Sequence, residues 1–480
     1  MRREGGDYRI LDKDLQRLTH AELAQMHAVR PVLRLGAGVL VFVALLLLAF
    51  GLSGRQDQVL MAGAGLIVAG WLGLSIGAND VGNALGPAVG SGALRLATGL
   101  ALVALAEIAG ATLAGHAVAQ QLAAGIFDPV LLGEDGRGPL VMLAALIAAA
   151  VWITVATAIG VPVSTSHSIV GAISGAGVAA IGAANIHWGT VARIATAWVL
   201  APMVSALVAG GLLVLVHRHV SGAPDRPTAA RRWLPPMIGA MTGLFAAYVA
   251  TLLRFGLPLG GAALVGIVAG LVAAAMTRLR IDAAIRDHAR QGSKLGTKRI
   301  FGPGLIFAAV IMAFAHGAND AGNVAGPLSI ILGQGSAEDV GRVPVLLICG
   351  GALIALGAVL FGRRLVVMVG SGITRLNPAR AFCVTLSTAL IVLIASGSGL
   401  PVSSTHVAVG GIFGVGFARE WMDRRQNRRR APMPQEETQR RRLIRRSHVI
   451  TITAAWLVTV PLTMGLGAGI AALILWSRGV

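Results

Sequence analysis

Long runs of apolar residues, separated by short polar segments, make up most of the chain. A membrane-spanning helix needs about 20 predominantly apolar residues. Runs without any Asp, Glu, Lys or Arg cover residues 35–52, 194–216, 233–253, 255–277, 343–362 and 447–477. Two other uncharged runs, 139–192 and 381–418, are too long for one crossing and predict helical hairpins, either re-entrant or made of two full passes. The pattern predicts an all-α polytopic membrane protein.

The composition agrees with that class of protein. The 480 residues are 55% hydrophobic and 13% charged, which is far from the balance of a soluble globular domain. The first 34 residues are polar and contain seven Lys or Arg. Such a tail is too long for a cleaved signal peptide, so 35–52 is interpreted as a retained first span. Cys349 and Cys383 lie in apolar runs, which favours small core residues over a disulfide framework.

Basic residues gather in the connections on one side of the predicted membrane. With the N-terminus inside, 34 of the 40 Lys and Arg fall in cytoplasmic segments. These segments are 1–34, Arg95, 217–232, 278–299, 363–380 and 419–446. The positive-inside rule therefore predicts a multi-pass protein of the cell (inner) membrane with a cytoplasmic N-terminus. It also explains the net charge of +19 without a nucleic-acid partner, and it makes 419–446 a basic cytoplasmic loop.

Two motifs occur twice, in the same order. GANDVGNALGP from Gly77 and GANDAGNVAGP from Gly317 match at eight of eleven positions. PVSTSHSIVG from Pro162 and PVSSTHVAVG from Pro401 follow at nearly equal distances. In the predicted topology the second copy of each motif runs in the opposite direction, which predicts two inverted repeats with a binding site between them at mid-membrane.

These repeats divide the chain into four parts. Residues 1–34 form a cytoplasmic tail, and 35–216 hold the first span and repeat one, with GAND at 77–80 and a hairpin tip at 162–168. Residues 217–299 form basic loops and two connecting spans. Repeat two covers 300–480, with GAND at 317–320, a hairpin tip at 401–407 and the loop 419–446.

Each GAND segment places one carboxylate and two amides inside an apolar run. The residues are Asn79, Asp80 and Asn83 in the first copy and Asn319, Asp320 and Asn323 in the second. A charged side chain at mid-membrane costs at least about 2.5 kcal/mol on insertion scales, so it usually has a function. Gly86-Pro87 and Gly326-Pro327 predict a break in each helix that frees backbone carbonyls. Such oxygens suit a small cation or a proton carrier, although asparagines can also simply hold helices together.

The hairpin tips place a proline before a run of small hydroxyl side chains. These are Ser164, Thr165 and Ser166 in the first tip and Ser403, Ser404 and Thr405 in the second. Ser and Thr are good N-caps, and a helix N-terminus at mid-membrane is an anion site that needs no Lys or Arg. The tips therefore predict a cradle for a tetrahedral oxyanion. The alternative is that the hydroxyls bond only within their own helices.

Three further features leave alternatives open. His167 and His406, at matching places in the tips, either carry protons or fix the tip through hydrogen bonds. His316 and Asp320 are spaced i, i+4, but Ile76 replaces the histidine in the first copy, which disfavours a dedicated transition-metal site. Glu107 is a lone intramembrane acid that belongs either to the ion path or to a local pair, and its counterpart region in the second half, around Leu347, offers no second acid.

At these four motifs the chain resembles the inorganic phosphate transporter family of PiT type, over roughly residues 59–476. The resemblance implies symport of phosphate with Na⁺ or H⁺, an inverted-repeat fold with two re-entrant hairpins, and a homodimer. It further implies that Asn79, Asp80, Asn319 and Asp320 bind ion and phosphate, and that the tip hydroxyls hold phosphate. The chain departs from the family at Gly82 and Gly322, where Ala or another small residue is usual, and these glycines are interpreted as loosening the helix break.

The function favoured by these observations is secondary active uptake of inorganic phosphate, coupled to H⁺ or Na⁺ by alternating access. Proton coupling is slightly preferred because His167 and His406 lie beside the predicted cradle. The alternatives are a permease for sulfate or another oxyanion and, less favoured, a passive anion channel. A hydrolase is disfavoured because no acid lies near Ser166 and His167 to orient the histidine. No cofactor and no metal other than Na⁺ are expected.

Overall fold

The computed structural model describes residues 36, 39, 43, 58–132, 137–159, 163–253, 258–291, 296–333, 343–368, 377–427 and 446–479. Within these ranges every regular element is helical. Ten of the helices are long and apolar enough to cross a membrane, and the chain is a multi-pass membrane protein. The N-terminal tail, nearly all of the predicted span 35–52 and most of the loop 419–446 lie outside the described residues.

The long helices of the first half are α2 (Gln58–Gly90), α3 (Leu96–Ala114), α4 (His116–Ala124), α5 (Arg137–Ile159), α6 (Thr165–Ile181) and α7 (Trp188–Val216). The second half contains α8 (Arg226–Leu252), α9 (Leu259–Gln291), α10 (Thr297–Ile331), α11 (Val343–Phe361), α12 (Arg363–Met368), α13 (Pro378–Gly397), α14 (Ser404–Asn427) and α16 (Arg446–Arg478). Short 3₁₀ turns at Pro129–Leu132 and Ala183–Asn185 and a π-helical turn at His217–Ser221 complete the list.

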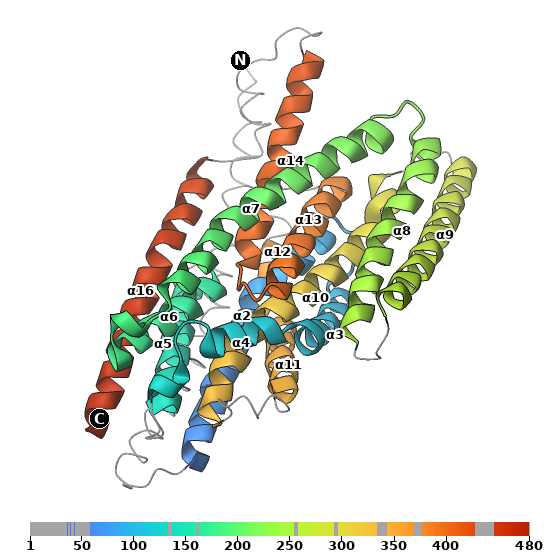
Figure 1. Ribbon diagram of the computed structural model, residues 1–480. Helices are drawn as coiled ribbons and strands as arrows, with labels where there is room; N and C mark the ends of the chain where they lie inside the picture. Colours follow the sequence, from blue (N-terminus) through green and yellow to red (C-terminus); the bar gives the residue numbers. More distant parts are fainter. Residues whose placement is uncertain are drawn as a thin grey trace, which may run out of the picture.

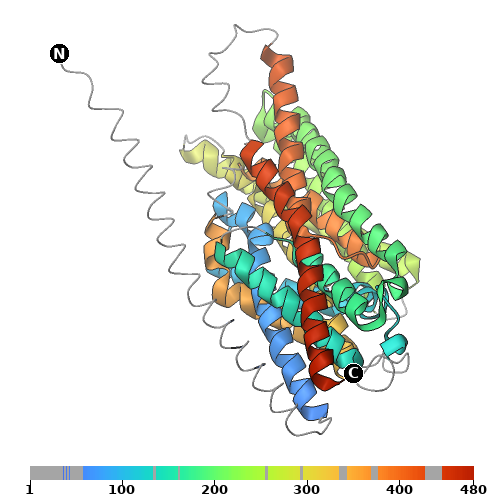
Figure 2. The ribbon, with the colours of Figure 1, turned by 90° about the vertical axis from the view of Figure 1, so that its left-hand side faces the viewer.

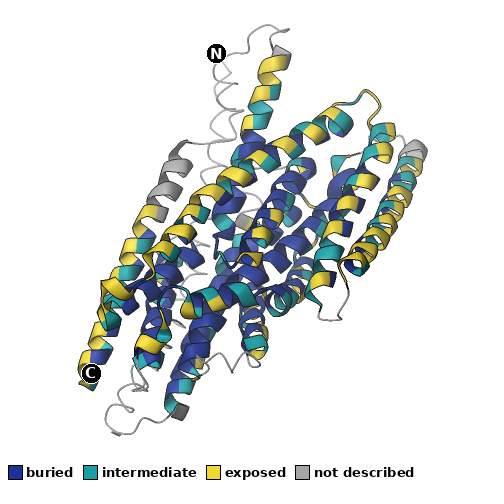
Figure 3. Cartoon of the chain, in the orientation of Figure 1, coloured by how far each residue is buried: buried dark blue, intermediate teal, exposed yellow. Residues whose placement is uncertain are grey.

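Helix α10 lies at the centre of the bundle (Figure 1). It contacts α2, α3, α4, α11 and α13, and 78% of its span is buried, against 17% for α9. The burial colours show the same contrast between a dark interior and the exposed α9 (Figure 3). On the opposite side, α16 packs along α5 and α6 (Figure 2). The acids of the two GAND segments are therefore carried by an inner helix pair rather than by helices at the edge of the bundle.

The predicted helix breaks at the two Gly-Pro pairs are wrong. Helix α2 runs on through Pro87, and α10 runs on through Pro327. Each proline lies in the last turn or so of its helix, so it removes one N–H without requiring the helix to end. Each proline still frees one backbone carbonyl, four residues earlier in its helix. Pro87 frees that of Asn83, and Pro327 frees that of Asn323.

A break does occur where none was predicted, inside the apolar run 96–127, whose one charged residue is Glu107. Helix α3 ends at Ala114, and α4 begins at His116 after Gly115. Helix α4 then packs closely on α10, because a Cβ on Gly322 would meet Val118 and the backbone of Ala119 within about 3 Å. Gly322 thus permits close helix packing, in place of the loosened break that the sequence suggested.

Both predicted helical hairpins are present, as α5–α6 and α13–α14. Ser164 is the N-cap of α6, and its hydroxyl accepts a hydrogen bond from the His167 backbone N–H at 3.2 Å. Ser403 accepts from the His406 backbone N–H at 3.3 Å in the same way. The capping role inferred for these serines is therefore confirmed. Whether each hairpin is re-entrant, and whether the two halves are inverted repeats, stay predictions.

The first glycine of each GAND segment marks a close helix crossing. A Cβ on Gly77 would clash with the backbone of Ile354 in α11, and one on Gly317 would clash with the backbone of Glu107 in α3. Small residues at crossings of this kind let membrane helices approach closely. Ile354 therefore meets Gly77 in the same way that Glu107 meets Gly317. This makes Ile354 the counterpart of Glu107, in place of the region around Leu347 that the sequence suggested.

Candidate ion and phosphate site

The tips of the two hairpins meet beside the GAND segment of α10. The Asn319 side chain donates to the Val402 carbonyl at 2.7 Å and accepts from the Val402 N–H at 3.0 Å. The Ser166 hydroxyl of the other tip donates to the same carbonyl at 2.9 Å. Asn319, Ser166 and Val402 are all nearly inaccessible to solvent. One asparagine therefore joins α10 to both hairpins, which is the role of interhelical connection considered for it from the sequence.

Asp80 of α2 receives a hydroxyl from each hairpin. Thr165 donates to Oδ2 at 3.3 Å, and Thr405 donates to Oδ1 at 3.1 Å. The amides of Asn79 and Asn83 lie 3.1 and 3.4 Å from the same Oδ1. The carboxylate is 2% exposed, so these neutral donors replace the water that it would otherwise need.

Asn83 extends this contact to the second hairpin. Its amide nitrogen donates to the Thr405 hydroxyl at 2.8 Å and lies 3.4 Å from the Ser404 hydroxyl. The helix periodicity predicted correctly that Asn79 and Asn83 would lie beside Asp80. The partner on the hairpin could not be predicted, because it is more than three hundred residues away in the sequence.

Asp320 of α10 has a different set of neighbours. Its Oδ1 accepts from the amides of Asn319 and Asn323 at 2.7 and 3.0 Å. Its Oδ2 lies 2.7 Å from Nε2 of His316, one turn earlier on the same helix. Nδ1 of that imidazole lies 2.7 Å from Oε1 of Glu107 on α3. The lone acid Glu107 therefore has a local partner, and through His316 it is connected to the acid of the GAND segment.

His316 brings the two halves of the site together. Its Nε2 lies 3.8 Å from Oδ2 of Asp80, so Asp80, His316 and Asp320 offer ligand atoms within 4.8 Å of one another. All three side chains are buried. Among the described residues, Oδ1 of Asn323 is buried without a hydrogen-bond partner, and Oδ2 of Asp320 faces Nε2 of His316. Oxygen atoms left in this state suit a small cation or a proton better than a second anion.

The histidines of the two tips lie elsewhere. The rings of His167 and His406 are 4.7 Å apart, and His167 stacks on Trp198 of α7 at 3.7 Å. Nδ1 of His167 lies 2.6 Å from the Ser164 hydroxyl, and the Trp198 indole donates to the Pro401 carbonyl at 2.8 Å. These contacts support the structural role for the two histidines. Sequence reasoning missed Trp198, because a tryptophan in an apolar run gives no signal of a partner.

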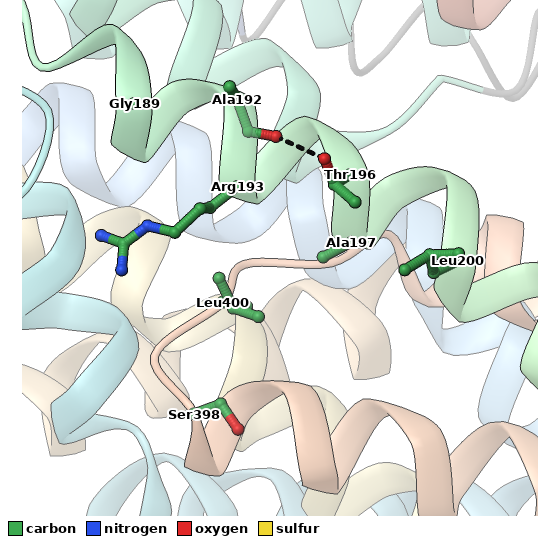
Figure 4. Close-up of a pocket in the computed structure, with 8 residues that line it drawn as sticks. All are labelled: Gly189, Ala192, Arg193, Thr196, Ala197, Leu200, Ser398 and Leu400. Carbon is green, nitrogen blue, oxygen red and sulfur yellow. Dashed lines mark hydrogen bonds between the residues drawn. The ribbon is translucent and has the colours of Figure 1, made fainter.

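A cavity of about 490 Å³ lies between α7 and the segment that leads into the second tip (Figure 4). Figure 4 shows the Arg193 side chain on one side of this cavity, with Leu400 and Ser398 opposite. No residue of the four motifs lines it, and its walls are mainly apolar. The cavity is thus not the place where the acids and hydroxyls converge.

Comparison with known proteins identifies the family. The family model for the phosphate transporter family matches residues 76–467, which include all four motifs. The chain belongs to this family. A relative from Helicobacter pylori (strain J99), named "Putative phosphate permease", is 37% identical over 430 residues, with 87% of this chain and 80% of that protein covered.

Two further comparisons extend the similarity within the family. The transporter is 31% identical to "Inorganic phosphate transporter 2-1, chloroplastic" of Arabidopsis thaliana, over 87% of this chain and 72% of that protein. A solved structure of a sodium-dependent phosphate transporter matches with a TM-score of 0.74 and 30% identity. The match covers 86% of this chain and 98% of the other, so the two folds agree over nearly all of the solved protein.

Proposed function

We propose that the protein is a symporter that takes up inorganic phosphate by alternating access and binds its coupling cation at Asp80 and Asp320. The observation that carries the proposal is the convergence of the two hairpin N-termini on the buried Asp80, with Asp320 close by across His316. Thr165 and Thr405 make the contact with Asp80, and Ser166 and Asn319 join the tips to α10. Phosphate would accept hydrogen bonds from the hydroxyls that now donate to Asp80. The cation would bind the carboxylates of Asp80 and Asp320.

Charge balance supports symport over a passive channel. The N-termini of α6 and α14 each supply a partial positive charge of roughly half a unit. That is too little to offset a phosphate dianion, and Asp80 and Asp320 add negative charge to the same region. A cation must therefore enter with the anion, which makes transport of the anion alone unfavourable.

Na⁺ is the coupling ion that we favour. The preference for H⁺ rested on His167 and His406, but His167 stacks on Trp198 and the His406 ring meets it edge-on, which supports a structural role for both. The carboxylates and the unpaired amide oxygen of Asn323 are the hard oxygen ligands that Na⁺ takes. A neighbour of similar fold is named as sodium-dependent. His316, between the acids, is the group through which H⁺ would act instead.

Uptake of radiolabelled phosphate and sulfate into proteoliposomes tests the whole proposal. We expect phosphate to accumulate when an inward Na⁺ gradient is imposed at constant pH, with sulfate far slower. Faster sulfate uptake would make the protein a permease for another oxyanion. Accumulation driven by a pH gradient without Na⁺ would assign coupling to H⁺. Equilibration without accumulation under either gradient would make it a channel and refute symport.

The orientation of the protein in the membrane and its assembly into a homodimer are proposed from the sequence. The basic-residue count supports a cytoplasmic N-terminus and a cytoplasmic connection at 217–232, and the family resemblance supports a homodimer. A cysteine introduced at Pro224, which is exposed in the same connection, should resist an impermeant reagent in intact cells and react after permeabilisation. Rapid labelling in intact cells would overturn the topology.

A further inference from the structure

A second cavity, of about 250 Å³, lies where α7, α13 and α14 come together at the end remote from the hairpin tips. These three helices pack against one another (Figure 1). The polar residues in its wall are His217, Ser221, Asn377, Arg380, Arg419 and Asp423. Arg419 lies 15 residues along α14 from Ser404, which is roughly 22 Å at the helical rise. The cavity is therefore separate from the transport site.

The end of α7 is irregular where it forms this cavity. Residues His217–Ser221 form a π-helical turn, closed by a hydrogen bond of 2.8 Å from the Gly222 N–H to the His217 carbonyl. A turn of this kind widens the helix and turns side chains away from the regular helical faces. Here it brings both His217 and Ser221 to the cavity wall.

Several hydrogen-bond donors in the wall have no partner among the described residues. The Ser221 hydroxyl is buried without one. The Arg380 guanidinium, on the first turn of α13, forms neither a hydrogen bond nor an ion pair there, and only its backbone N–H is used, by the Asn377 cap at 2.9 Å. Arg419 has one acidic neighbour, Asp423, at 3.6 Å. Unpaired donors that converge on one cavity are the complement of an oxyanion.

We propose that this cavity binds a phosphate group. Arg380 and Arg419 supply planar guanidinium groups, which match the geometry of phosphate oxygens, and a bound anion would offset the repulsion between them. The N-terminus of α13 adds a favourable dipole. Among the described residues of the wall, Asp423 is the one acid, and it is 52% exposed, so its charge is screened by solvent. The ligand is either inorganic phosphate or the headgroup of an anionic phospholipid, and both would reach this face from the predicted cytoplasmic side.

Binding measurements on the full-length protein test the site. In nanodiscs of phosphatidylcholine, the number of radiolabelled phosphate ions bound per chain is compared between the unmodified protein, Arg380→Gln, Arg419→Gln and Ser221→Ala. In a second arm, native mass spectrometry counts phosphatidylglycerol retained from mixed vesicles. Each arginine substitution should weaken binding at this site about tenfold or more, since a hydrogen bond to a charged group contributes that much.

Arg424→Gln and Arg425→Gln are the matched controls, because both residues lie on α14 outside the cavity wall. Loss of one phosphate per chain in the cavity variants supports a site for the free ion. Unchanged phosphate binding with loss of phosphatidylglycerol supports a headgroup site. If the cavity variants match the controls in both arms, or if the controls lose as much ligand, no specific phosphate site exists there. Because phosphate uptake is measured separately, failure of this site leaves the transport proposal standing.

Discussion

The two GAND segments have nearly the same sequence and lie in different electrostatic surroundings. Asp80 is held by hydroxyls from both hairpins, through Thr165 and Thr405. Asp320 is held by amides of its own helix and lies 2.7 Å from His316. A repeated motif therefore supplies two carboxylates whose properties are set by the helices packed around them.

The difference extends to the helix crossings behind each acid. Gly317 packs on the backbone of Glu107, and Gly77 packs on that of Ile354. One turn before Asp320 lies His316, which pairs with Glu107, whereas the corresponding Ile76 and Ile354 are both fully buried and apolar. The crossing behind Asp320 thus has a buried ionisable pair where the crossing behind Asp80 has two isoleucines. We infer that Asp80 links the proposed cation site to the hairpin hydroxyls that would hold phosphate, and that Asp320 acts mainly on the cation.

The largest effect is expected from removing either carboxylate. Asp80→Asn and Asp320→Asn should each reduce coupled uptake about 100-fold or more, because a buried charge that pairs with a cation contributes at least 3 kcal/mol or so. Asparagine keeps the shape and leaves insertion unaffected, as membrane fractionation should show. Uptake with unchanged rate and ion dependence in both variants would falsify the assignment of these acids.

The next effect concerns the ionisable pair Glu107–His316, which the crossing behind Asp80 lacks. His316→Ile makes α10 resemble α2 but leaves Glu107 buried without its partner, which should cost about 3–5 kcal/mol in stability. The double variant Glu107→Ile/His316→Ile should regain the part of that stability that was lost by leaving Glu107 unpaired, whereas Asp320 still lacks its contact with His316. Thermal unfolding in detergent provides the measurement.

The control for this cycle is Ile76→Val in the first half, which should cost only about 1 kcal/mol. A coupling energy near zero between positions 107 and 316 would show that the two side chains act independently. If the double variant also transports at the normal rate, the pair has no part in coupling and the contrast between the halves is structural only.

A smaller effect should separate the asparagines of the two segments. Asn83 bonds to Thr405 of the second hairpin at 2.8 Å, whereas Asn323 bonds to Asp320 of its own helix at 3.0 Å. Asn83→Ala should therefore raise the phosphate KM about tenfold, the scale of one lost hydrogen bond near a charge. Asn323→Ala should mainly raise the cation concentration needed for half-maximal uptake. The inference about the two acids fails if both variants change the same constant.

Much of this arrangement follows from local sequence. The apolar runs predicted the spans and, where overlong, the hairpins. The proline and serine positions predicted the hairpin tips, and helical spacing placed Asn79 and Asn83 beside Asp80. These features depend on neighbours within a few residues. The predicted breaks at Pro87 and Pro327 failed because a proline near a helix end costs little, and the proline rule alone does not distinguish these positions.

The contacts that distinguish the two acids could not be predicted. The partner of Glu107 is His316, more than two hundred residues later, and that of Asn83 is on a hairpin still further away. The pair Glu107–His316 depends on the close packing of α10 on α3 at Gly317, which no local sequence pattern predicts. The sequence did show that the two GAND segments differ, since Ile76 stands where the second segment has His316. It did not show that Glu107 would pair with His316.

The smallest effect compares two tryptophans of α7. The indole of Trp198 donates to the Pro401 carbonyl at 2.8 Å, and that of Trp188 donates to the Ala183 carbonyl at the same distance. Trp198 is buried against the tip and Trp188 is 43% exposed, so only the first carbonyl loses all partners when the donor is removed. Trp198→Phe should cost about 1–2 kcal/mol in thermal unfolding, and Trp188→Phe should cost much less because water replaces the indole. Equal costs would mean that the carbonyl at the second tip finds another partner, and that Trp198 supports the tip only by stacking on His167.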